Sequence, residues 1–68
     1  MTSKQRQELS EITEEAVENN DLETLTEIYS IIAQDFKNEP DPFAFEWFGS
    51  MLDPDQWNEV TTRFEKNQ

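Results

Sequence analysis

Four stretches of the sequence place apolar side chains three and four residues apart, the spacing that puts them on one face of an α-helix. Asn19–Asn20, Asp41–Pro42 and Asp53–Pro54 separate these stretches. Asparagine tolerates the left-handed turn at a helix end, and aspartate before proline is a favourable helix start. We therefore predict four helices, at about 3–18, 21–36, 42–52 and 54–66. The short Asn19–Asn20 break favours an antiparallel helical hairpin at the start of the fold.

The length of the chain limits what these helices can build. A domain of 68 residues buries only about 60% of its unfolded surface, and this one has no Cys to form a disulfide. Its high net charge favours disorder, but two Trp, one Tyr, five Phe and a single Gly favour a packed chain. We expect one acidic all-α domain over 1–68, a compact bundle of three to four short helices.

The charge balance indicates what the surface can bind. Sixteen acidic and five basic side chains give a net charge of −11, which repels nucleic acid and anionic membranes and attracts basic protein surfaces. No run of hydrophobic residues exceeds three, too few for a bilayer span or a signal peptide. A secreted domain this small would usually carry disulfides, so we expect a cytoplasmic chain. Its partners should be proteins, without direct nucleic-acid or membrane binding.

The first predicted helix carries the one ordered array of acids. Its apolar arc consists of Gln5, Leu9, Ile12, Ala16 and Val17. Opposite lies an arc, about 120° wide, of Glu8, Glu11, Glu14, Glu15 and Glu18. These carboxylates step along the helix at intervals of roughly 5–10 Å, comparable with the phosphates of one DNA strand.

Two interpretations of this arc remain open. It is either a face directed at a basic partner, imitating a nucleic-acid backbone, or the solvated side of an amphipathic helix made of a good helix former. Glutamates four residues apart repel one another, and only Lys4 and Arg6 are nearby. That repulsion favours a partner.

The second and third predicted helices differ in their apolar pattern. On the second, Ile31 falls outside the apolar face, beside Thr24 and Glu27. The third is apolar around most of its circumference and must be covered on several sides. We expect Phe43, Trp47 and Trp57 in the core. A second set points away from them and is the candidate apolar contact face or homodimer seam: Phe45, Phe48 and Leu52.

Metal and catalytic chemistry find little support in the sequence. The acids of 53–59 alternate as in a calcium loop, but Asn58 and Phe64 stand where that loop needs Gly and Glu. The chain has no His to activate a serine, and so small a bundle leaves little room for a cleft. We expect no enzyme, no cofactor and no metal site.

These observations lead to two functional hypotheses. The first is a non-enzymatic acidic binding module that docks on a basic protein surface, such as that of a nucleic-acid-binding protein, as an inhibitor or modulator. In size and charge, though not in any motif, the chain resembles small acidic helical proteins, many phage-encoded, that block nucleic-acid-binding enzymes. The alternative is a structural or adaptor subunit that uses the aromatic helix 42–52 for assembly or homodimerisation.

Overall fold

The structure, a computed structural model, describes residues 2–66, which form four helices and no strand. They are α1 (Ser3–Glu18), α2 (Leu22–Asn38), α3 (Pro42–Met51) and α4 (Pro54–Lys66). The predicted all-α bundle is confirmed, and every helix begins and ends within two residues of its predicted position.

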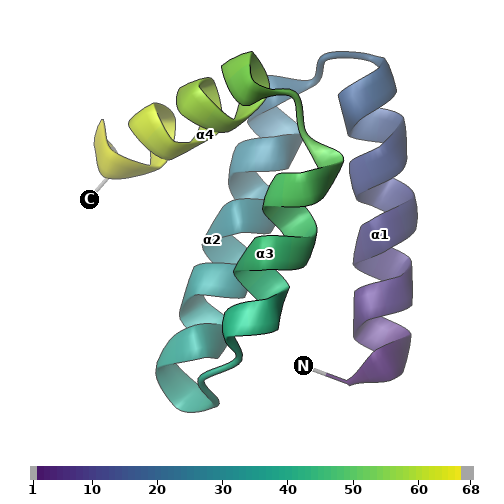
Figure 1. The fold of residues 1–68 in the computed structure, drawn as a ribbon, viewed down its shortest axis with the longest axis vertical. Coiled ribbons are helices and arrows are strands. Elements are labelled where there is room, and N and C mark those ends of the chain that lie inside the picture. The colour runs from purple at the N-terminus through teal and green to yellow at the C-terminus, as the bar shows by residue number, and fades with distance from the viewer. Residues whose placement is uncertain (1, 67–68) are drawn as a thin grey trace.

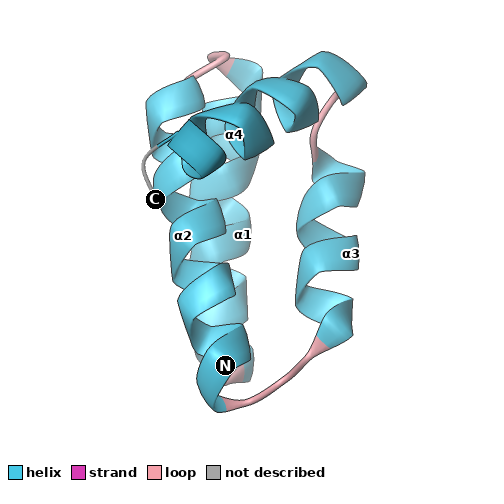
Figure 2. Ribbon diagram, turned by 90° about the vertical axis from the view of Figure 1, so that its left-hand side faces the viewer, coloured by secondary structure: helices cyan, strands magenta, loops and turns pink. Residues whose placement is uncertain are grey.

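The four helices form a flat bundle with α2 at its centre. Figure 1 shows α1 and α2 side by side, with α3 lying against them and α4 crossing near the turn that joins α1 to α2. α2 contacts all three of the other helices. Figure 2, turned by 90°, shows that α3 covers one side of the α1–α2 pair. The molecule measures 27 × 26 × 16 Å.

The helix starts use the capping residues that the sequence suggests. At α1, Thr2 Oγ1 accepts a hydrogen bond from the Gln5 N–H at 3.2 Å, and Gln5 Oε1 accepts one from the Thr2 N–H at 3.0 Å. Asp41 caps α3 by accepting from the Phe43 N–H at 3.1 Å.

Asp21 caps α2 through two hydrogen bonds from Thr24. The hydroxyl and then the backbone N–H of Thr24 lower the pKa of the Asp21 carboxyl. A lowered pKa means that this cap stabilises the fold above the unfolded-state pKa and is lost as the pH falls through the folded-state value. The cap is therefore ionised at neutral pH.

The turn between α1 and α2 depends on Asn20, whose φ of 53° lies in the left-handed region. Its N–H donates to the Val17 carbonyl at 3.2 Å, and the Asp21 N–H donates to the Ala16 carbonyl at 2.8 Å. These two bonds close the C-terminal end of α1. The prediction that asparagine supplies this turn is confirmed.

Gln56 ties this turn to the start of α4. Its buried amide nitrogen donates to the Val17 carbonyl and to Asn20 Oδ1, both at 3.1 Å. Its oxygen accepts from the Asp53 N–H, also at 3.1 Å. The sequence suggested that the Asp53 carboxylate caps α4. The side-chain hydrogen bond described at the start of α4 instead joins the Asp53 backbone N–H to the Gln56 side chain.

The core brings together apolar side chains from all four helices and the α3–α4 connection. Its buried members are Ala16, Leu25, Ile28, Ile32, Ala44, Phe48, Leu52 and Val60. Tyr29 lies among the aromatic rings that join α2 to α3 and α4. Its centroid is 4.9 Å from that of Phe64, 5.7 Å from that of Trp57 and 6.2 Å from that of Phe48, in tilted or edge-on arrangements that aromatic rings favour.

Thr13 also lies fully inside the bundle, although it is polar. Its hydroxyl donates to the Leu9 carbonyl one turn earlier, at 2.6 Å, so that no donor is left unpaired. The predicted apolar arc of this helix omitted Thr13, although this residue falls between Leu9 and Val17 around the helix.

We predict that the two phenylalanines of α3 differ sharply in their effect on stability. Phe48 is 0% exposed and Phe43 is 68% exposed. Phe48→Ala should lower the free energy of unfolding by about 3–5 kcal/mol through lost burial and a cavity, whereas Phe43→Ala should cost less than about 1 kcal/mol. Urea denaturation followed by circular dichroism measures both. Equal losses would contradict this assignment of the core.

Candidate functional site

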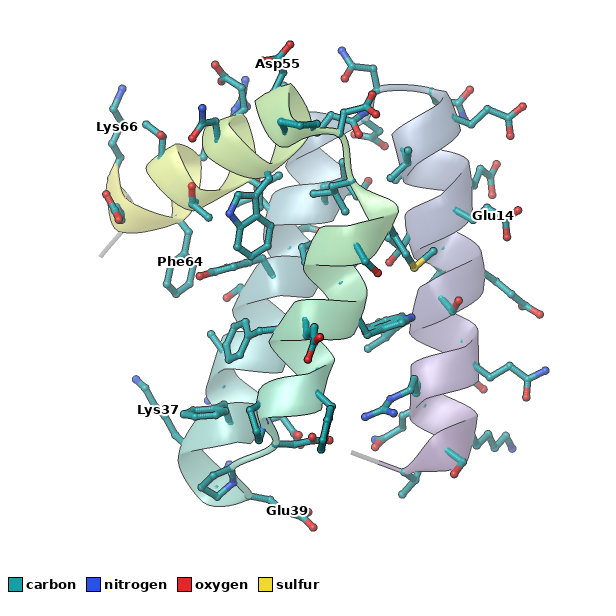
Figure 3. The ribbon with its side chains drawn as sticks, in the orientation of Figure 1. Glu14, Lys37, Glu39, Asp55, Phe64 and Lys66 are labelled. Carbon is teal, nitrogen blue, oxygen red and sulfur yellow. The ribbon has the colours of Figure 1, made fainter. Side chains whose placement is uncertain are left out.

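The five glutamates singled out in the sequence lie together on the outer side of α1. We call Glu8, Glu11, Glu14, Glu15 and Glu18 the acidic arc, and all five are exposed. Figure 3 shows the Glu14 side chain pointing away from the bundle. Within residues 2–66 no hydrogen bond or ion pair engages any of the five side chains. The arc therefore presents unneutralised charge to solvent.

The described ion pairs do not compensate this charge. Arg6 pairs with Asp41 at 2.9 Å, linking the start of α1 to the cap of α3. Arg63 lies 3.7 Å from Glu59 on α4. Lys4 precedes the arc on α1. From Glu8 to Glu18 the arc extends for about 15 Å along the helix axis, since an α-helix rises 1.5 Å per residue.

The acids form a line of separate charges rather than a cluster. Across residues 2–66, no group of three or more acidic side chains is placed to hold a metal ion. A line of exposed carboxylates attracts a complementary row of lysine and arginine side chains.

The predicted apolar contact face of Phe45, Phe48 and Leu52 is wrong for Phe48 and Leu52. The structure buries Phe48 and Leu52 in the core. Phe45 is half-buried, with its ring 5.7 Å from that of Tyr29 and 5.3 Å from that of Phe36. Only Phe45 among the three keeps substantial exposed surface.

The physical reason is a rotation of α3 by about one residue, or 100°, relative to the expected packing. Phe43, Trp47 and Met51 are spaced four residues apart, but so are Ala44, Phe48 and Leu52. The residues that face the bundle are Ala44, Phe48 and Leu52, whereas Phe43 is exposed and Trp47 is half-buried. The expectation that Phe43 lies in the core is therefore also wrong.

An apolar groove between α1 and α2 was missed. Ile12 is 47% exposed and Ile31 is 51% exposed, and both line a groove of about 190 Å³. Its other lining residues are Gln5, Glu8, Leu9 and Asp35. The sequence placed Ile12 with the core residues. The signal that pointed toward this site was Ile31, which fell outside the apolar face of its helix.

The comparisons with known proteins give no relative for this chain. The sequence matches no protein-family model and no curated protein, and the fold matches no solved structure. None of the helices in residues 2–66 has the length and apolar character that crossing a lipid bilayer requires.

We predict that the acidic arc lowers the stability of the fold. Glu11 has glutamates three residues before it and three and four residues after it, so Glu11→Lys replaces repulsive pairs with attractive ones. The substitution should raise the free energy of unfolding by about 0.5–1 kcal/mol at low salt, and by less at high salt. Urea denaturation at two NaCl concentrations measures this gain.

Glu46→Lys is the matched control, because exposed Glu46 on α3 has no charged residue three or four positions away. It makes the same change in net charge without relieving such repulsion. An equal gain from both substitutions would show that net charge alone, and not the arc, sets the cost.

Proposed function

We propose that this chain is a non-enzymatic binding protein that docks on a basic protein surface through the acidic arc, as an inhibitor or modulator of its partner. The observation that carries the proposal is the set of five exposed glutamates on α1, none of which has a partner among residues 2–66. Repulsion along such a face costs stability, and a bound row of cations would relieve it.

The geometry of the arc supports a partner that ordinarily binds nucleic acid. Carboxylates that step along a straight helix for about 15 Å offer a line of negative charge comparable to a stretch of phosphate backbone. Attraction between this line and a basic groove would speed association and weaken with salt, since the Debye length is about 8 Å at physiological ionic strength.

The adaptor hypothesis has less support. Assembly through α3 would have to use Phe43 and the half-buried rings of Phe45 and Trp47, since Phe48 and Leu52 are buried. Only Phe43 among these rings is mostly exposed, so the apolar patch is small compared with those that mark stable interfaces. Homodimerisation would also bring together two chains that each carry −11.

We predict that the arc determines which proteins the chain captures. The immobilised protein is incubated with cell lysate at about 50 mM NaCl, and bound proteins are identified by mass spectrometry. The proposal expects basic, nucleic-acid-binding proteins that are released by about 500 mM NaCl and by added duplex DNA, which competes for the same surface. A variant with Glu8, Glu11, Glu15 and Glu18 changed to Gln should lose them.

The control variant removes four exposed acids elsewhere: Glu23→Gln, Glu46→Gln, Asp55→Asn and Glu65→Gln. Both variants lose the same number of charges, so they separate the arc from net charge. Capture that survives neutralisation of the arc, or that disappears equally with both variants, would refute the proposal.

A further inference from the structure

We propose that the groove between α1 and α2 receives the apolar side chains of a basic amphipathic helix from a partner protein. We call it the α1–α2 groove; Gln5, Glu8, Leu9, Ile12, Ile31 and Asp35 line it. The apolar part of the inference rests on the groove itself. The basic character of the partner rests on the proposed function.

The centre of the groove is aliphatic. Ile12 and Ile31 are each about half exposed, on neighbouring helices, and partly buried Leu9 lies between them and the core. The groove, at about 190 Å³, is smaller than the roughly 300–1,000 Å³ of pockets that enclose free small molecules. It is suited to a few apolar side chains presented by another protein.

The edges of the groove are acidic. Glu8 lines it on the α1 side and Asp35 on the α2 side. Exposed Glu15 lies one turn beyond Ile12, and exposed Glu27 lies one turn before Ile31. A partner that complements an apolar centre between two acidic edges would carry an apolar stripe flanked by Lys and Arg.

A helix is the natural shape for this occupant. An amphipathic helix binds such grooves with apolar anchors at three- and four-residue spacing. Figure 2 shows α3 against one side of the α1–α2 pair, and no residue of α3 or α4 lines the groove. An added helix could therefore pack against both α1 and α2 without displacing either.

Charge excludes the main competing occupants. A second copy of the chain would bring the same acidic edges and another −11 against this one. An anionic lipid surface would be repelled for the same reason. A basic helix is the occupant whose charge relieves the repulsion around the groove.

The test uses two synthetic peptides of about 16 residues, each made of the same Lys and Leu residues. One has its leucines at three- and four-residue spacing, and the other has them shuffled so that no apolar face forms. Binding to the fluorescently labelled full chain is followed by anisotropy at low and high salt. The amphipathic peptide should bind about tenfold more tightly, since it alone can cover the exposed halves of Ile12 and Ile31.

A double variant, Ile12→Gln with Ile31→Gln, should remove this tenfold preference and leave the salt-sensitive attraction. Phe43→Gln, which removes an exposed ring on α3, should leave the preference intact. Circular dichroism verifies that both variants are folded. The comparison of the two peptides on the unmodified chain decides the question even where a variant fails this check.

The outcomes separate this inference from the proposed function. Equal, salt-sensitive binding of both peptides would overturn the groove while supporting docking through charge. Preferential binding that depends on Ile12 and Ile31 but not on salt would support the groove and contradict a basic partner. A dimer seen by light scattering and lost in the double variant would show that the occupant is a second copy, which overturns the inference.

Discussion

The arrangement of the four helices depends on the burial of the Phe48 side chain. Its side chain has no exposed surface, and its ring lies among those of Tyr29 on α2 and Trp57 on α4. A chain of 68 residues with a charge of −11 has a small apolar core to set against considerable self-repulsion. The contacts of Phe48 join α3 to α2 and α4, and α2 also packs directly against α1.

Local chemistry predicted the helices well because their starts and ends are marked by short-range signals. Asn20, Asp21 and Asp41 each act within a few residues of their own position. The orientation of α3 could not be obtained in the same way, since two sets of residues with identical spacing compete to face inward. Only contacts with other helices, such as that between Phe48 and Tyr29, select one of them. Gln56 and Thr13 were missed because polar residues are expected at the surface, whereas hydrogen bonds within the protein allow these two side chains to be buried.

The two parts of the candidate site differ in how far the sequence could predict them. Glutamates are rarely buried, so their common spacing on one helix was enough to place the arc at the surface. The α1–α2 groove depends on two isoleucines that lie far apart in the chain and become neighbours only when α1 and α2 pack. The arc lies on α1, and the groove lies between α1 and α2. We infer that α1 and α2 form the binding side of the molecule, with α3 and α4 as its support.

The assignment of binding to α1 and α2 is tested most directly by NMR. The isotopically labelled chain is titrated with the amphipathic Lys–Leu peptide, and the chemical-shift changes are mapped on the structure. The largest shifts are expected at the methyl groups of Ile12 and Ile31 and at the backbone amides around Glu8 and Glu15. The amides and side chains of α3 and α4 should change little. Shifts that centre instead on Phe43 and the exposed side of α3 would contradict the assignment of the binding side to α1 and α2.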